Sequence, residues 1–324
     1  LSIGLVTNTR FHSCSGGNPA PVAQPPAKPI GDTVDNSIYF DLSAAPMRTR
    51  LAILDDHHHQ LATKGYSYWS QSPSERLANG FKLLGIGNDA KTKKGEKLGV
   101  DTGILYLAPA TNATPKGETL CDRATVAKCL KACLFTAGRG RMSSVEMSRL
   151  YKTLWLLQGP FSFNNALEVE INANATKSER NGRKFAVRLN GTSDVDWSAL
   201  AKRCPDVQFY DYTKNVERLG HTPSNYHLTA SYSAANSDYR LDVLDAVLKG
   251  YNAAVVFRDR KTAEYAMKHG FAGFRVLDGD EHDVRFLDDR ATAPGEHGYI
   301  IALYAKGPAK KDSSGFVIDL PYAA

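Results

Sequence analysis

The sequence of 324 residues lacks long apolar runs, and none approaches the roughly 20 consecutive apolar residues that a membrane-spanning helix needs. Its first residues, LSIGLVTNTRFHSC, also lack the basic segment, apolar stretch and small-residue cleavage site of a secretory signal. Hydrophobic residues make up 42% and charged residues 23%, close to globular averages, which excludes wholesale disorder. We therefore expect a soluble cytoplasmic protein that does not contact a membrane.

A large excess of charge of one sign is also absent. Lys and Arg number 40 against 34 Asp and Glu, which gives a net charge of +6. Because most bases are interspersed with acids, this mild excess favours an ordinary solvated surface over a nucleic-acid-binding face. A polyanionic partner is compatible with the charge but is not required by it.

Cysteine is rare, with five residues in total, yet three of them fall in one short stretch as Cys121, Cys129 and Cys133. An odd number in a chain without a secretory signal makes a disulfide framework a poor explanation. The spacing is C-x7-C-x3-C, no histidine lies between the cysteines, and Cys204 is far along the chain, so the four ligands of a structural zinc site are not at hand. Three thiolates with an open coordination position favour an iron-sulfur cluster, with zinc as the alternative.

A simpler interpretation of these cysteines stays open. Cys129 and Cys133 could be apolar residues four apart on the buried face of a short helix, which is common for free cysteine.

The chain divides into an N-terminal region, residues 1–98, and a more regular region, residues 99–324. The first contains the Pro-rich stretch NPAPVAQPPAKPIG, a histidine triplet at 57–59 that we interpret as solvent-exposed, and a helix predicted over 74–84. In the second, short apolar strands alternate with helical or polar stretches, typical of βαβ units. The predicted strands are 103–109, 185–191, 207–212, 226–232, 253–258, 273–278 and 299–305.

Several of these strands are apolar on both faces, which predicts parallel strands covered on both sides. The fold class is therefore α/β, a full or partial (β/α) barrel preceded by a less regular N-terminal region. Ligand sites of such folds lie at the carboxyl ends of the strands, where the cysteine loop would lie.

Polar and glycine residues gather in two segments of this scheme, one just after the cysteine loop and one at the end of the second predicted strand. The segment TAGRGRMSS, with Gly138, Arg139 and Gly140, opens a helix whose free amides suit an anion. RLNGTSD ends the second strand, where Asn190, Thr192 and Ser193 are candidates for ligand contact and Gly191 would allow close approach to the backbone. For Asp194 we prefer a cap of the following helix.

The third and fourth strands carry Asp211 and His227, which we take as candidates for substrate contact. Alternation places His227, Thr229 and Ser231 on one face of the fourth strand, toward the barrel interior, if the residues between them pack against helices. A buried histidine of purely structural role is about as probable.

An acidic turn, LDGDEHD, follows the sixth strand. Asp278, Asp280 and His282 could hold a divalent cation there, as in a metal-dependent nuclease or phosphotransferase. A solvated turn, or a lid paired with Arg258, is the commoner fate of such a run. The lysines of AKGPAKKDSSGF could bind phosphate or nucleic acid, but three lysines alone are a weak signal.

The regular region resembles the phage family known as gene product 88. The shared blocks are CDRATVAKCLKACLFTAGRG, RLNGTSD, VQFYDYTK, YHLT, VLDGDEHDVRFLD and AKGPAKKDSSGF, in one order from about residue 99 to 316. This resemblance implies a phage or prophage origin, and hence the cytoplasm of a host cell, but no particular activity.

A looser resemblance is to radical SAM enzymes, which have three cysteines in the loop after the first barrel strand. Their spacing is C-x3-C-x2-C, and their Gly-rich GGE segment is replaced here by Asn190-Gly191-Thr192. The resemblance implies a [4Fe-4S] cluster on the three cysteines and S-adenosylmethionine as a cofactor, acting on an unknown small-molecule or nucleic-acid substrate. It assigns cofactor contacts to Gly138, Arg139, Gly140, Asn190, Thr192 and Ser193.

The competing hypothesis is a noncatalytic nucleic-acid-binding phage protein with a structural zinc or no metal. It predicts a contiguous basic face and binding that weakens steeply with salt.

Overall fold

The structure is a computed structural model, and it describes residues 82–87, 90–109, 119–133, 143–158, 160–291, 293 and 295–320. All of them belong to one compact unit, residues 35–324. The Pro-rich stretch, the histidine triplet and Gly138, Arg139 and Gly140 lie outside the described residues. So does most of the helix predicted over 74–84, whose last residue instead begins a strand.

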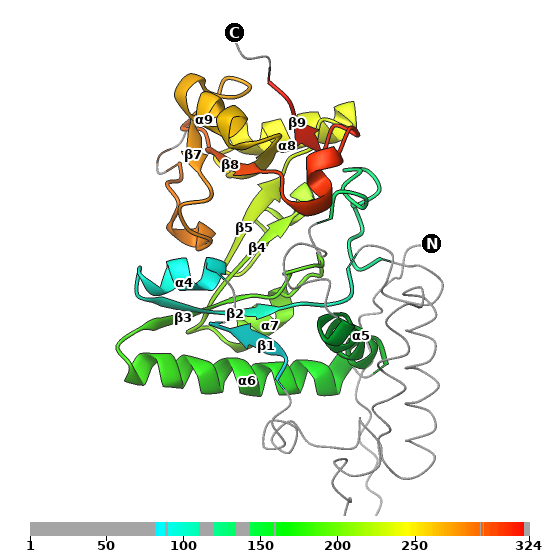
Figure 1. Ribbon diagram of the computed structural model, residues 1–324. Coiled ribbons are helices and arrows are strands. Elements are labelled where there is room, and N and C mark those ends of the chain that lie inside the picture. Colours follow the sequence, from blue (N-terminus) through cyan, green and yellow to red (C-terminus); the bar gives the residue numbers. More distant parts are fainter. Residues whose placement is uncertain are drawn as a thin grey trace, which may run out of the picture. The chain divides into compact units, whose positions relative to one another are not determined.

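A nine-stranded sheet forms the centre of this unit (Figure 1). Its order is β1-β2-β3-β4-β5-β6-β8-β7, and β9 also pairs with β6. All neighbours are parallel except β1 and β2, which are antiparallel. The strands are β1 (Leu84–Ile86), β2 (Val100–Leu105), β3 (Lys184–Arg188), β4 (Gln208–Thr213), β5 (Tyr226–Ser231), β6 (Ala253–Phe257), β7 (Val276–Asp278), β8 (Ile300–Tyr304) and β9 (Val317–Ile318).

Helices connect most of the parallel strands, so the predicted α/β class is confirmed. They are α4 (Ala90–Glu96), α5 (Ser143–Gln158), α6 (Pro160–Arg180), α7 (Ser198–Arg203), α8 (Ser237–Leu248) and α9 (Arg260–His269). Asn236 and Asp259 cap α8 and α9 by accepting hydrogen bonds from the amides of Tyr239 and Thr262. The longest helix of the described residues, α6, was not predicted from the sequence.

A closed barrel is not confirmed. The sheet ends at β1 on one side and β7 on the other, and within the described ranges these two edge strands do not pair with each other. β1 runs antiparallel to its neighbour, and β8 lies between β6 and β7. The sheet that the sequence predicted as a barrel is therefore open in this part of the chain.

The two faces of the sheet are covered differently. On the helix-covered face, strand residues such as Phe185, Val187 and Phe209 pack with helix residues such as Trp155 and Phe163 in one large core. Alternation along each strand sends the intervening side chains to the second face.

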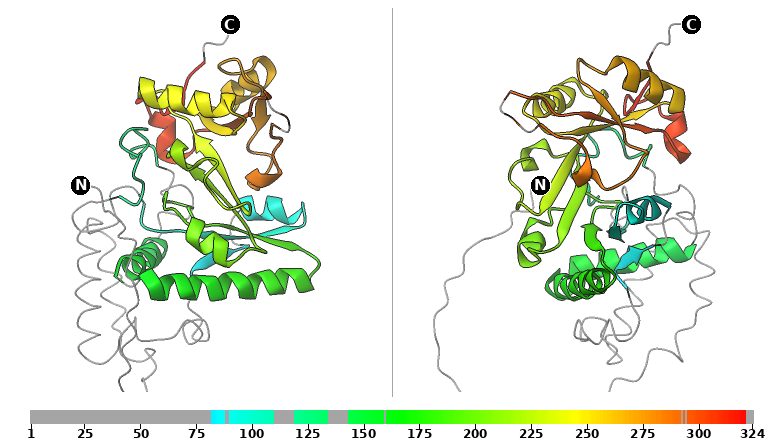
Figure 2. Two further views of the ribbon diagram at one scale, coloured as in Figure 1. Left: turned by 180° about the vertical axis from the view of Figure 1, so that it is seen from behind. Right: turned by 90° about the vertical axis from the view of Figure 1, so that its left-hand side faces the viewer.

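The second face carries a smaller cluster of Val100, Ala186, Tyr210 and Val284, with Phe286 against it. It is covered by α4 and by residues 279–291, which follow β7 and contain the 3-10 turn η6 (Arg285–Leu287). Figures 1 and 2 show α6 and α4 on opposite sides of β2 and β3.

β1 and α4 precede residue 99 and yet pack on β2. The predicted domain boundary between residues 98 and 99 stays a prediction. In the part of the chain that is described, no helix combines the length and the apolar character needed to cross a membrane.

Candidate functional site

The cysteine loop, residues 119–133, lies over the carboxyl ends of several strands. The Asp194 amide, after β3, donates to the Leu120 carbonyl at 3.1 Å. After β4, Glu217 pairs with Arg123 at 3.0 Å. After β5, the Ser233 hydroxyl donates to the Ala127 carbonyl at 2.8 Å. The loop is thus held by residues that follow three adjacent strands. It lies at the carboxyl ends of the strands, where the sequence predicted it.

The loop is built of turns rather than of a regular helix. The Ala127 and Cys129 amides donate to the Arg123 and Ala124 carbonyls. Between them Lys128 has a φ of 51°, a left-handed conformation that costs a residue with a side chain about 1–2 kcal/mol. The short helix that the simpler interpretation predicted is therefore not found in the loop. Cys129 is buried, as that interpretation also predicted. Strained residues of this kind often lie near functional sites.

The three cysteines are free thiols. Cys129 is buried in the large core, where its sulfur donates weakly to the Ala124 carbonyl at 3.8 Å, while Cys121 and Cys133 are partly exposed. Burial raises the pKa of Cys121 to about 12, and the charge of Asp194 adds to this rise. Among the described residues no group of three His, Cys, Asp or Glu side chains is arranged to hold a metal ion.

Lys214, the residue after β4, interacts electrostatically with two of these cysteines. Burial alone would lower the pKa of Lys214, but its electrostatic interactions with Cys129, Asp194 and Cys121 hold this pKa above its ordinary value. The same Lys214 charge opposes the raised pKa of Cys121. The ammonium therefore stands where it can offset negative charge in the cysteine loop.

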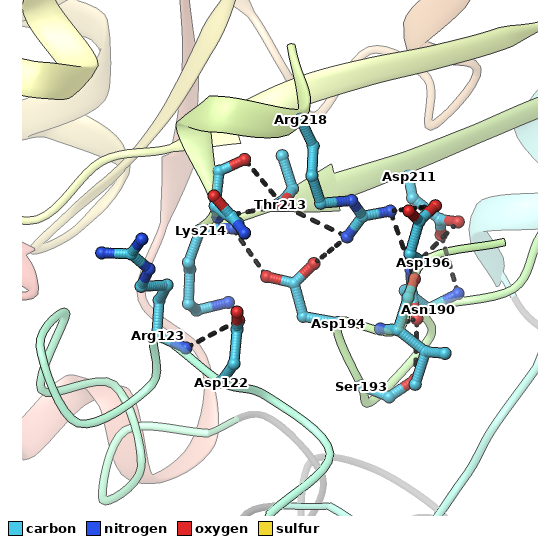
Figure 3. Close-up of polar contacts among 12 residues, drawn as sticks. Asp122, Arg123, Asn190, Ser193, Asp194, Asp196, Asp211, Thr213, Lys214 and Arg218 are labelled. Carbon is cyan, nitrogen blue, oxygen red and sulfur yellow. Dashed lines mark hydrogen bonds and ion pairs between the residues drawn. The ribbon is translucent and has the colours of Figure 1, made fainter. Parts of the chain in front are cut away.

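Asp194 fixes the position of this lysine. Its two oxygens accept from the Lys214 amide at 2.7 Å and from Arg218 Nη1 at 2.9 Å, so that Asp194 lies between them (Figure 3). The predicted helix cap by Asp194 is wrong, because α7 has Trp197 at its N-cap with no side-chain bond. A side chain committed to Arg218 and to the β4 turn has no oxygen left for the helix.

Asn190 is the centre of the RLNGTSD turn. Its oxygen accepts from the Ser193 hydroxyl, the Val195 amide and the Trp197 indole, and its Nδ2 donates to the Val195 carbonyl and to Asp211. Both polar atoms of Asn190 are engaged within the protein, which gives the side chain a structural role in shaping the turn. Cofactor contact by Asn190 and Ser193 stays a prediction.

The neighbouring residues of this turn face β2. The Thr192 hydroxyl donates to the Leu107 carbonyl at 2.5 Å, and the Gly191 amide donates to the Leu105 carbonyl at 3.0 Å. A Cβ on Gly191 would lie 2.7 Å from that carbonyl oxygen. The close approach that glycine permits here is thus to the protein's own backbone.

Asp211 and His227, the two candidates for substrate contact, do not come together. Asp211 pairs in register with Leu228 on the helix-covered face, whereas His227 pairs with Tyr210 on the second face. A one-residue offset between neighbouring strands places two side chains on opposite sides of a sheet. Their individual roles stay predictions.

Asp211 is fully buried and accepts from the Asn190 amide and the Tyr226 hydroxyl at 2.7 and 2.8 Å. Burial raises its pKa to about 7, and these donors oppose the shift.

His227 is half-buried, with Arg290 Nη1 at 3.1 Å from its Nδ1 and the Thr229 hydroxyl at 3.4 Å from its Nε2. Burial and the charge of Arg290 lower its pKa to about 3, so the imidazole is neutral. Leu228, Ala230 and Tyr232 pack in the helix-covered core, as the predicted alternation requires.

His227 also lines a cavity of about 370 Å³ at the amino-terminal ends of β4, β5 and β6, at the other end of the strands from the cysteine loop.

The acidic turn after β7 is not arranged as a cation site in the described structure. Asp280 pairs with Lys306 at 3.0 Å and Asp278 accepts from the Asp280 amide. Arg258 does not pair with this turn, because both its Nε and Nη2 donate to Asp319.

A family model described as Gene product 88 matches residues 81–320. Searches of curated proteins and of solved structures returned no match.

Sequence reasoning missed two parts of this region. Lys214 stands out only as a lone base at a strand end, and its place beside the cysteines depends on a contact between segments far apart in the chain. The second is Arg285, which is fully buried although arginine is normally an exposed residue. In neither case does a local pattern signal burial.

Proposed function

For this chain, which belongs to the gene product 88 family, we propose that Cys121, Cys129 and Cys133 bind a metal centre through their thiolates, with an iron-sulfur cluster as the leading candidate and zinc as the alternative. The observation that carries the proposal is the placement of a three-cysteine loop over the carboxyl ends of adjacent parallel strands, beside the Lys214 ammonium. Ligand sites of open parallel α/β sheets lie at this edge.

The charges around the loop suit a thiolate centre. Ligation removes the thiol protons, so three cysteines bring three negative charges into a largely buried place. Lys214 interacts electrostatically with Cys129 and Cys121 and would offset part of that charge. If the cysteines stayed neutral and apolar, a nearby cation would gain no comparable electrostatic stabilisation.

Metal binding would require the loop to contract. In the described conformation the three cysteines are not arranged around one point suited to an ion. The loop consists of turns, with one residue in a left-handed conformation, and only Cys129 is fixed in the core. Movement of the two partly exposed cysteines toward Cys129 is therefore the change that binding would produce.

Such a cluster supplies one-electron chemistry when it is bound, and an iron without a protein ligand is open to a small molecule. S-adenosylmethionine is the cosubstrate that the radical SAM resemblance implies. Support for its predicted contacts is weaker, because the side chains of Asn190, Thr192 and Ser193 are engaged within their own turn.

The test is anaerobic purification of the full chain after iron-sulfur reconstitution, with iron, sulfide and zinc quantified and the visible absorbance recorded. A variant with alanine at all three positions of the loop is compared with Cys204→Ala. Cys204 is a matched control because it is also a buried free thiol but lies outside the loop.

We expect about four irons per chain in the wild type and in Cys204→Ala, and none in the triple variant. One zinc per chain with the same dependence on the three cysteines would retain the thiolate site and reject the cluster. Equal metal content in all three proteins, or none in any, would reject the proposal. If the cluster is present, cleavage of S-adenosylmethionine is the next assay.

A further inference from the structure

Residues 279–291, here called the covering segment, lie across the second face of the sheet and contact three neighbouring strands in turn. Asp283 Oδ2 accepts from Arg188 Nη1 of β3 at 2.8 Å. Phe286 meets Tyr210 of β4 edge to face at 5.4 Å between ring centroids. Arg290 lies at 3.1 Å from His227 of β5. The register of the sheet places Tyr210 and His227 side by side in one row.

Beneath this segment several polar atoms are buried without a partner. The Tyr212 hydroxyl, Arg188 Nε and Arg285 Nε make no hydrogen bond to any described residue. They come from β4, β3 and η6, three different elements. A buried polar group left unpaired costs about 1–3 kcal/mol, so such groups are normally bound to water or to a ligand.

These groups share one neighbourhood. The Arg188 guanidinium lies 4.8 Å from the centre of the Tyr212 ring. Burial raises the pKa of Tyr212 to about 12, and the charges of Arg285, Asp283, Arg188 and Asp288 all act on its hydroxyl. The hydroxyl therefore keeps its proton at neutral pH and can donate it in a hydrogen bond.

We propose that Tyr212, Arg188 and Arg285 form a binding site for the oxyanion of a small molecule, a phosphate or a carboxylate group, between the sheet and the covering segment. The unpaired atoms of these three residues are N–H or O–H donors, and those of Arg188 and Arg285 belong to guanidinium groups, which match the geometry of these anions. One unpaired acceptor lies beside them, Asp288 Oδ2 at 3.3 Å from Arg285 Nη1. Arg188 Nη1 already pairs with Asp283, so an added anion would meet the unpaired Nε of this guanidinium.

The inference goes beyond the proposed metal centre and does not depend on it. Its test uses metal-free full chain in reducing buffer, so the outcome is separate from that of the iron measurements. Unfolding midpoints and calorimetric titrations are recorded with inorganic phosphate and with malonate. Sodium chloride at equal ionic strength is the reference.

Tyr212→Phe is the informative variant because it removes one hydroxyl and keeps the ring that Arg188 stacks on. Tyr299→Phe is the matched control, since the Tyr299 ring also lies beside an arginine, Arg275, at 5.6 Å. We expect phosphate, malonate or both to raise the midpoint beyond chloride in the wild type and in Tyr299→Phe. Affinity should fall about tenfold or more in Tyr212→Phe, because a hydrogen bond to a charged group is lost.

Without added anion, Tyr212→Phe should unfold at a higher temperature than the wild type, because it no longer buries an unpaired hydroxyl. No effect of either anion beyond chloride would overturn the proposal and assign the buried donors to water. An anion effect of equal size in Tyr212→Phe and wild type would overturn it too, because the anion would then bind elsewhere.

Discussion

On the helix-covered face of the sheet, hydrocarbon side chains of strands and helices meet one another, whereas on the second face guanidinium and carboxylate groups meet beneath the covering segment. Both faces are buried, but the first gains free energy from every apolar contact, while the second gains only if each charge keeps its partner. The helix-covered face is thus suited to holding the fold, and the second face to recognising a polar ligand.

The largest effect should come from breaking the helix-covered face. Phe209 is fully buried among the helices, so Phe209→Ala should lower the free energy of unfolding by about 3–5 kcal/mol. Urea unfolding followed by circular dichroism measures this change. A loss below about 1 kcal/mol would show that the apolar core is not what stabilises the sheet.

On the second face the single and the double substitution should differ. Asp283→Ala leaves the Arg188 charge buried without its partner and should cost about 3 kcal/mol. The double variant Arg188→Met with Asp283→Leu should cost much less, because both charges are removed together. Urea unfolding of both proteins checks the contrast, and equal losses would mean that the two faces are stabilised in the same way.

Asp211 is an exception on the helix-covered face, since it places a fully buried carboxyl group there, bonded to Asn190 and to the Tyr226 hydroxyl. Its folded-state pKa of about 7 lies above the ordinary value of 3.8, so its contribution to stability is fully present below about pH 4 and is lost as pH rises toward 7. The slope is at most about 1.4 kcal/mol per pH unit. The free energy of unfolding of the wild type and of Asp211→Asn is measured at several pH values in this range. The contribution of Asp211 to the loss of stability with rising pH should disappear in the variant. The same pH dependence in both proteins would contradict the raised pKa.

The smallest effect concerns the cysteine loop, which lies over the carboxyl ends of the strands. Lys128→Gly should raise the free energy of unfolding by about 1 kcal/mol, because glycine adopts the left-handed conformation without steric cost. Lys131→Gly, in the same loop but without a positive φ, should not stabilise the protein. Thermal unfolding of both variants tests this, and a gain in the second would point to the loop in general rather than to Lys128.

Much of the helix-covered face could be predicted from the sequence, because short apolar runs located seven of the eight strands that pair in parallel, from 103–109 to 299–305. β1 and β9 were missed since strands of three and two residues carry too few positions to show alternation.

The second face could not be predicted in the same way. Arg188, Asp283 and Arg285 are charged residues in segments that resemble ordinary polar loops and strand ends, and only the folded arrangement brings them together. The placement of the cysteine loop was predictable from its position after β2. Its neighbour Lys214 was not, because that contact depends on the register of β4 against β3.

The order of the sheet also bears on how the chain assembles during synthesis. From β2 to β6 each new strand pairs with the one made just before it, so a growing chain can extend one edge of the sheet step by step. β7 breaks this sequence, since its sheet partner, β8, is made later and inserts between β6 and β7. Until β8 emerges, β7 has no strand to join, and the covering segment that follows it cannot be held in place from both ends. The second face can therefore close only after β8 has joined the sheet.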